Sequence, residues 1–114
     1  HELDFAHLDV KPNNVLVSSG RGKLCDMETA VHLPKSGRMF LSGIGTAGFK
    51  APEMDKPMEV DARKADVWSL GRCGEFAEEF SRGSWSGMQL LVEDDPAKRP
   101  TMRACLDAFR RQHG

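Results

Sequence analysis

Apolar residues recur at helical spacing in the second half of the chain. Between residues 64 and 80 they form a face that is broader than the stripe of a surface helix. The residues of this face are Ala65, Trp68, Leu70, Cys73, Phe76, Ala77 and Phe80. The pattern therefore predicts a helix over residues 64–80 that is mostly buried.

Two shorter helices are expected after it. Residues 88–92 fit a short helix that ends before Asp95-Pro96, because a residue that precedes proline disfavours helical backbone. Thr101 is a suitable N-cap for the last helix, since apolar residues follow it at the positions i, i+3, i+4 and i+7. These residues are Met102, Cys105, Leu106 and Phe109.

The first half of the chain has the residue pattern of short strands separated by turns and loops. Residues 15–17 and 23–25 flank a polar, glycine-containing turn at 18–22, which predicts a small hairpin. Residues 31–48 contain one proline, four glycines and no sustained period, so we expect a long loop, and loops of this length are usually functional. The pattern as a whole predicts a mainly α fold with a small β-hairpin.

Composition narrows the class of protein. The 114 residues suit one domain, and the net charge of -1 predicts no nucleic-acid partner and no anionic membrane surface. Three cysteines lie far apart without Cys-x-x-Cys spacing, so we expect a reducing, intracellular compartment such as the cytoplasm. No apolar run approaches the roughly 20 residues that a membrane helix needs, which predicts no membrane segment.

An acid, a cation and a carboxamide share one short loop at residues 7–14, His-Leu-Asp-Val-Lys-Pro-Asn-Asn. Phosphoryl transfer uses these groups: a carboxylate orients the attacking hydroxyl, a positive charge faces the moving phosphate, and an amide oxygen binds magnesium. Asp9, Lys11 and Asn14 are the candidates. The alternative is a polar surface turn in which Asp9 caps a neighbour and Asn14 opens the turn.

The same segment resembles the catalytic loop of protein kinases, usually written His-Arg-Asp-Leu-Lys-Pro-x-Asn, with Leu8 in place of the arginine. The resemblance implies that Asp9 is the catalytic base or the hydroxyl-orienting residue. It also implies that Lys11 neutralises charge on the transferred phosphate of ATP and that Asn14 binds Mg²⁺.

Residues 26–28, Asp-Met-Glu, follow the second hairpin strand and resemble the Asp-Phe-Gly metal motif of the same family. The resemblance implies that Asp26 is the main Mg²⁺ ligand beside the ATP phosphates. Met27 keeps an apolar side chain, whereas Glu28 removes the backbone freedom of glycine and adds a carboxylate. Without the resemblance, Asp26 reads as a turn residue after a strand.

An Asp-x-Glu motif also suits small-molecule kinases of the aminoglycoside and choline type, so a second substrate class competes up to Glu28. Residues 45–53, Gly-Thr-Ala-Gly-Phe-Lys-Ala-Pro-Glu, resemble instead the substrate-side loop of protein kinases. In that family the threonine hydroxyl, here of Thr46, bridges the catalytic aspartate and lysine and marks serine/threonine kinases. A glycine-rich turn before a proline-initiated helix explains Ala51-Pro52 but not the whole string.

Two later segments extend the resemblance. Residues 66–71, Asp-Val-Trp-Ser-Leu-Gly, resemble the start of the central buried helix of the kinase C-terminal lobe, which implies that Asp66 holds the catalytic-loop backbone. The alternative for Asp66 is a cap favoured by the helix dipole. Residues 95–101, Asp-Pro-Ala-Lys-Arg-Pro-Thr, resemble the element whose arginine pairs with the glutamate of Ala-Pro-Glu, which implies a pair between Arg99 and Glu53.

The resemblance implies that residues 1–114 are a partial protein kinase domain, a kinase-like C-terminal lobe whose N-terminal lobe is absent. No glycine-rich loop or Val-Ala-Ile-Lys lysine precedes His7, and the sequence begins with His rather than Met, so we expect a piece of a longer protein. The stretch between residues 66 and 99 is also shorter than the corresponding stretch of most kinases. We expect residues 83–87 to be the short connection, or shortcut, that replaces most of one peripheral helix.

The function expected from this resemblance is phosphoryl transfer from ATP, with Mg²⁺, to serine or threonine residues of a protein substrate. Two alternatives stay open. One is a catalytically impaired, pseudokinase-like module that binds partners, and the other is a small-molecule phosphotransferase.

Overall fold

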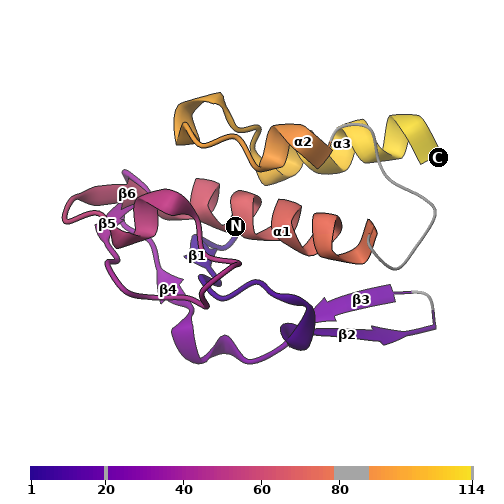
Figure 1. Ribbon diagram of the computed structural model, residues 1–114, viewed down its shortest axis with the longest axis horizontal. Coiled ribbons are helices and arrows are strands. Elements are labelled where there is room, and N and C mark those ends of the chain that lie inside the picture. Colours follow the sequence, from indigo (N-terminus) through magenta and orange to yellow (C-terminus); the bar gives the residue numbers. More distant parts are fainter. Residues whose placement is uncertain (20, 79–87, 114) are drawn as a thin grey trace.

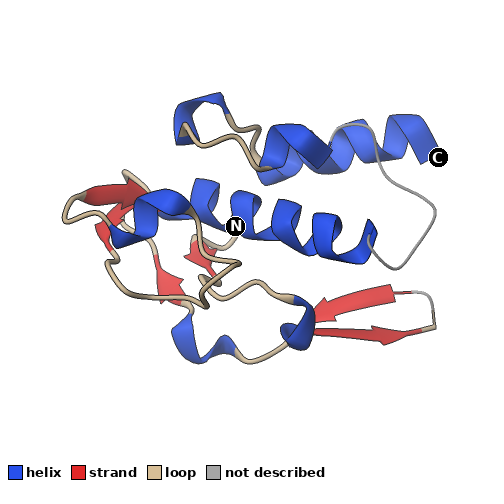
Figure 2. Cartoon of the chain, in the orientation of Figure 1, coloured by secondary structure: helices blue, strands red, loops and turns tan. Residues whose placement is uncertain are grey.

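One long helix, α1 (Ala62–Glu78), runs through the middle of the molecule (Figure 1). In the computed structural model, which describes residues 1–19, 21–78 and 88–113, helices α2 (Met88–Leu91) and α3 (Met102–His113) lie along one side of α1. Most of the strands lie on its other side (Figure 2). Both halves of the described fold therefore depend on contacts with α1.

The strands form three separate two-stranded antiparallel sheets. They pair β1 (Phe5–Ala6) with β4 (Val31–His32), β2 (Val15–Ser18) with β3 (Arg21–Leu24), and β5 (Arg38–Phe40) with β6 (Glu59–Asp61). Short 3-10 helices occur at Pro12–Asn14, Met27–Thr29, Pro52–Asp55 and Pro96–Lys98. Each of these turns lies within or beside one of the motifs of the sequence.

The predicted helices are present with small differences in their bounds. Helix α1 begins at Ala62, two residues before the predicted start, because the Asp61 carboxylate accepts the Lys64 N–H at 3.2 Å and caps the helix. The predicted end at residue 80 and the expected shortcut at 83–87 lie outside the described residues. The prediction for α3 is confirmed, since the Thr101 hydroxyl oxygen accepts the Ala104 N–H at 3.1 Å.

The predicted fold class needs one correction. The hairpin is confirmed as β2 and β3, but residues 31–48 are not one long loop, because they contain β4 and β5. Strands of two or three residues are too short to show a period of two, and their partners β1 and β6 lie elsewhere in the sequence. The fold is therefore helical around α1 with three small sheets rather than one.

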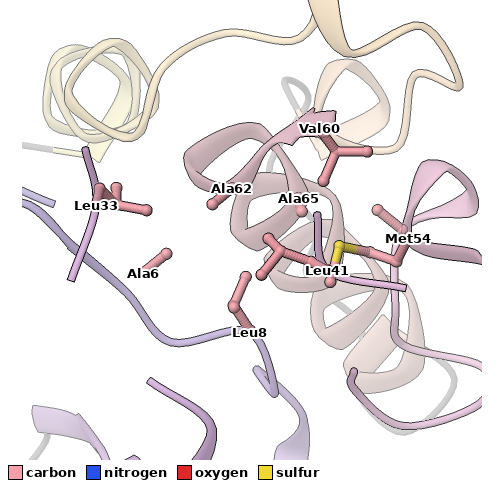
Figure 3. Packing of buried hydrophobic residues seen from close by; sticks show 9 residues of the cluster. Ala6, Leu8, Leu33, Leu41, Met54, Val60, Ala62 and Ala65 are labelled. Atoms are coloured by element: carbon pink, nitrogen blue, oxygen red, sulfur yellow. The ribbon is translucent and has the colours of Figure 1, made fainter. Parts of the chain in front are cut away.

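Two apolar clusters meet α1. The larger one joins β1, the segment 33–60 and the start of α1 (Figure 3). Its buried members are Ala6, Leu8, Leu33, Leu41, Ala51, Met54, Val60, Ala62 and Ala65. The smaller one joins α1, α2 and α3 through Val67, Leu91 and Cys105. The prediction that α1 is mostly buried is confirmed only in part: of the described side chains on its predicted apolar face, Ala65 is buried, Trp68 and Cys73 are half-buried, and Leu70 is 37% exposed.

Helices α1 and α2 approach each other closely at Gly71. A Cβ at this position would lie 2.7 Å from Cβ of Leu91, a distance that folded proteins do not tolerate. Glycine is therefore required where the two helices cross.

None of the helices in the described ranges has the length and apolar character needed to cross a membrane.

A buried ion pair ties the 3-10 helix Pro52–Asp55 to the segment that leads into α3. The Arg99 guanidinium donates two hydrogen bonds to the Glu53 carboxylate, one of them at 2.7 Å from Nη2 to Oε1. The two residues are 2% and 4% exposed. Three backbone carbonyls, those of Lys64, Glu93 and Asp94, accept further hydrogen bonds from the guanidinium. The buried cation is thus surrounded by acceptors, which offsets its desolvation.

We expect Arg99→Ala to lower the free energy of unfolding by about 3 to 5 kcal/mol, because it leaves the Glu53 carboxylate buried without its cation. Arg103→Ala is the matched control, since the pair of Arg103 with Glu2 has side chains that are 60% and 77% exposed. Its loss should cost no more than about 1 kcal/mol. Urea denaturation of the two variants would contradict the prediction if their midpoints were equal.

Candidate active site

The Thr46 side chain joins two side chains of the loop at residues 7–14. Its hydroxyl donates a hydrogen bond to Oδ1 of Asp9 at 2.6 Å and accepts one from Nζ of Lys11 at 2.9 Å. The ammonium of Lys11 also lies 3.6 Å from Oδ2 of Asp9, and the two side chains are 25% and 15% exposed. An acid, a cation and a hydroxyl therefore meet at a site that solvent can still reach.

Local backbone structure explains why these three residues meet. Lys11 is extended, because it precedes Pro12, and its chain turns back in the 3-10 helix Pro12–Asn14. Thr46 begins a tight turn in which its carbonyl oxygen accepts the N–H groups of Phe49 and Lys50 at 3.0 and 2.9 Å. These two turns fix the backbone beside Lys11 and at Thr46, the two residues whose side chains are hydrogen-bonded to each other.

Asn14 lies on the inner side of the same loop and is 6% exposed. Its side-chain nitrogen donates to the Asp9 carbonyl at 2.9 Å and to the Asp9 carboxylate at 3.4 Å. Its backbone oxygen accepts the Cys25 N–H at 2.8 Å, so the loop is bonded to the residue before Asp26. The β2–β3 hairpin thus returns the chain from Asn14 to Asp26.

Asp26 has a left-handed backbone with φ of 59° and an exposed side chain. One of its carboxylate oxygens accepts the Glu28 N–H at 3.3 Å and caps the 3-10 helix Met27–Thr29. A non-glycine residue in this region of backbone conformation is strained and recurs at functional sites. The other oxygen of the carboxylate faces no hydrogen-bond donor among the described residues.

Asn14 and Asp26 carry the side-chain oxygens that could hold Mg²⁺. Magnesium prefers oxygen ligands and usually takes one or two from the protein, with water and substrate phosphates completing its shell. The Asn14 amide oxygen accepts no hydrogen bond from the part of the chain that the structure describes. No group of three or more His, Cys, Asp or Glu residues in that part could hold a metal without further ligands.

His7 connects the two halves of the site, a role that sequence analysis missed. The imidazole Nδ1 accepts the Asp9 N–H at 3.1 Å, so the proton is on Nε2, which donates to the Cys25 carbonyl at 2.9 Å. The His7 carbonyl accepts a hydrogen bond from the Thr29 hydroxyl at 2.8 Å. No local pattern in the sequence marks this role, because it depends on contacts with Cys25 and Thr29, which lie far from His7 along the chain.

Asp66 holds the backbone of the same loop from α1. Its carboxylate accepts the N–H groups of His7 and Leu8, each at 2.8 Å, and His1 Nε2 lies 2.9 Å from it. Burial raises the pKa of Asp66 above its ordinary value, while the two N–H groups act in the opposite direction. Asp66 is not the helix cap, because Asp61 occupies that position.

Leu8 is held in an unfavourable conformation between these contacts. Its φ is 69°, in the left-handed region, and its side chain is 4% exposed. In Figure 3 the side chain points from the loop toward Leu41 and the α1 helix. A strained residue of this kind costs about 1 to 3 kcal/mol and persists only where its surroundings fix it. Here the Asp66 carboxylate and the apolar cluster do so.

The structure thus brings most of the predicted site residues together. Asp9, Lys11, Asn14 and Thr46 form one hydrogen-bonded group, and Asp26 is joined to it through the backbone of the hairpin. The other predicted residues contact the frame around this group. These are Asp66, which bonds the loop backbone, and Glu53 and Arg99, which bond each other.

A model of the protein kinase domain matches residues 1–74. The chain belongs to the protein kinase domain family. The matched residues include every predicted site residue except Arg99. The matched stretch covers more than half of the chain. It contains the loop at residues 7–14, the β2–β3 hairpin, the segment with Thr46 and most of α1.

The chain is also similar to named kinases. Cyclin-dependent kinase-like 2 of Homo sapiens and of Pongo abelii are each 36% identical over 72 residues, which cover 62% of this chain and 15% of those proteins. The protein of the same name from Mus musculus is 35% identical over 72 residues, or 62% of this chain and 13% of that protein. The matched stretch therefore spans only a small part of these relatives.

The grip of Asp66 on the loop can be tested by a pair of identical substitutions in one helix region. Asp66→Asn should lower the free energy of unfolding by about 1 to 3 kcal/mol, because an amide NH2 group, which donates, replaces one of the two acceptor oxygens and a buried N–H loses its partner. Asp61→Asn should be nearly neutral, since asparagine caps helices as well as aspartate. Chemical denaturation at neutral pH measures both. Equal stability of the two variants would show that the Asp66 contacts contribute little.

Proposed function

We propose that this chain forms the C-terminal lobe of a protein serine/threonine kinase and supplies its catalytic residues. The observation that carries the proposal is the Thr46 hydroxyl, which lies between the Asp9 carboxylate and the Lys11 ammonium. These groups are hydrogen-bonded to each other, and the Asp9 and Lys11 side chains remain 15% and 25% exposed, so the site is not closed to solvent. The ATP-binding lobe would come from the rest of the full-length protein.

Asp9 is the residue that receives or orients the acceptor hydroxyl in this proposal. Its carboxylate is fixed by Thr46 on one oxygen and faces Asn14 and Lys11 on the other. Positioning of this kind lowers the barrier because the attacking oxygen is held in line with the phosphorus before reaction. Lys11 provides positive charge next to the same carboxylate, where negative charge on the transferred group would gather.

Asn14 and Asp26 are the residues that would hold Mg²⁺ with ATP. Bound Mg²⁺ would neutralise the phosphate oxygens and orient the terminal phosphate. What the chain itself contributes is the spacing: the Asn14 carbonyl bond to Cys25 and the His7 bond to the Cys25 carbonyl keep the two ligands' segments in register. The match to the protein kinase domain favours this reading over a small-molecule phosphotransferase.

A second candidate is a pseudokinase-like module that binds partners without catalysis. The observation that favours it is Glu28, whose N–H bonds the carboxylate of Asp26 within a 3-10 turn. A glutamate in that turn has less backbone freedom than glycine, which limits how far Asp26 can reorient toward a metal. The two candidates differ in one measurement, the turnover of the full-length protein.

We expect Asp9→Asn to lower kcat of the full-length protein by about 100-fold or more, because it removes the proton acceptor without changing the volume of the side chain. The KM for ATP and the melting temperature should stay near those of the wild type. Asp94→Asn, which changes an exposed carboxylate, is the control. Near-normal turnover by Asp9→Asn would remove Asp9 from the mechanism, and a wild type without turnover would favour the pseudokinase-like module.

The choice of acceptor is a separate prediction. Peptides with serine or threonine should be phosphorylated and matched peptides with tyrosine should not, because the Thr46 contact to both Asp9 and Lys11 holds the substrate-side loop close to the carboxylate. A short acceptor side chain reaches Asp9 across that distance, whereas a tyrosine ring places its hydroxyl farther from the peptide backbone. Radiolabelled phosphate transfer to the peptide series measures it. Equal labelling of the tyrosine peptides would refute the assignment.

A further inference from the structure

The backbones of two segments touch at Gly45, one residue before Thr46. Its φ is 110°, a conformation that residues with a side chain rarely adopt. A Cβ at this position would lie 2.9 Å from Cβ of Lys50 and 3.2 Å from the carbonyl oxygen of Leu8. Both the conformation and the space at this point therefore require glycine.

The close approach of Gly45 to Leu8 lies next to the hydrogen bond between Thr46 and Asp9. Leu8 comes directly before Asp9, and Gly45 comes directly before Thr46. The hydrogen bond from Thr46 to Asp9, at 2.6 Å, therefore lies one residue beyond the point where the two backbones meet. The separation of the backbones at Gly45 sets how far the Thr46 hydroxyl lies from the carboxylate.

Neither neighbour of Gly45 can move away freely. Leu8 is held by its N–H bond to Asp66 at 2.8 Å and by its buried side chain. Lys50 is held by its N–H bond to the Thr46 carbonyl at 2.9 Å and by its ammonium, which bonds Asp55 at 2.7 Å. An added methyl group at Gly45 would push the segment with Thr46 away from the loop with Asp9.

We infer that Gly45 is a positioning residue for phosphoryl transfer, and this inference rests on the proposed kinase function. Gly45 touches no reacting atom. It allows the substrate-side segment to approach the catalytic loop closely enough for one hydroxyl to bond Asp9 and Lys11 together. Its effect on the reaction is exerted through Thr46.

The chain offers a matched control for the test. Gly43 also has a positive φ, 84°, but a Cβ there would meet nothing within 4 Å. Gly43→Ala thus carries the conformational strain of the substitution without the collision. The difference between Gly45→Ala and Gly43→Ala isolates the contact with Leu8 and Lys50.

In the full-length protein, Gly45→Ala should lower kcat for peptide phosphorylation by about 10- to 100-fold with an unchanged KM for ATP, since small misplacements of catalytic groups have effects of this size. The kcat of Gly43→Ala should stay within about 3-fold of the wild-type value. The reason is that a Cβ at position 43 would meet no atom within 4 Å. A kcat for Gly45→Ala equal to that of Gly43→Ala would overturn the inference.

A double-variant cycle separates positioning from a general loss of structure. If Gly45 acts through Thr46, Gly45→Ala should have little further effect on kcat in a Thr46→Ala background, and its cost in unfolding free energy should fall toward that of Gly43→Ala, which carries the backbone strain alone. Additive losses would overturn the inference. The unfolding part of the cycle needs no activity, so a wild type without turnover would refute the proposed function while the cycle still decides the role of Gly45.

A third variant covers the case in which Gly45→Ala does not fold. Lys50→Gly removes the nearest atom that the new methyl group would meet. The double variant Gly45→Ala with Lys50→Gly should then recover a cooperative unfolding transition. If it folds with a kcat equal to that of Lys50→Gly alone, the approach of Gly45 to the Leu8 carbonyl has no effect on the reaction, and the inference fails.

Discussion

The Asp66 carboxylate, buried in α1 and bonded to two backbone N–H groups of the loop at residues 7–14, is the contact on which the rest of the structure depends. A carboxylate that is 2% exposed is costly to bury unless donors surround it, and here the N–H groups of His7 and Leu8 serve as donors. Those bonds hold Leu8 at a φ of 69°. With Leu8 and His7 fixed, the positions of Asp9 and the Cys25 carbonyl follow through the His7 ring.

Helix α1 anchors a second polar network as well as this one. The backbone carbonyl of Lys64 accepts a hydrogen bond from Arg99, and the Lys64 ammonium bonds the Arg99 carbonyl, so the ion pair with Glu53 is attached to the first turns of the same helix. Asp66 lies only two residues further along. One helix therefore positions both the loop at residues 7–14 and the segment that follows the Thr46 turn, and the apolar clusters on either side fix the helix itself.

Leu8 illustrates how a departure from a family pattern is built into packing. Its side chain belongs to the larger apolar cluster with Leu33 and Leu41, which come from the segment between Asp26 and Thr46. An arginine with the same side-chain direction would place a charge in that cluster without a partner there, at a cost of several kcal/mol. The leucine instead joins the loop at residues 7–14 to the segment between Asp26 and Thr46 by apolar contact.

The sequence by itself determined the helices, the hairpin and the identity of the chemical groups. Helical periodicity is a local property, so the pattern of α1 and α3 could be read directly, and the spacing of Asp9, Lys11 and Asn14 places them on one loop whatever the rest of the chain does. Only the tertiary structure decided the pairings of β1 with β4 and of β5 with β6, because strands of two or three residues carry no periodic signal. It also decided the role of His7 and the need for glycine at position 45. Those depend on the distance between backbones far apart in sequence, which local patterns do not encode.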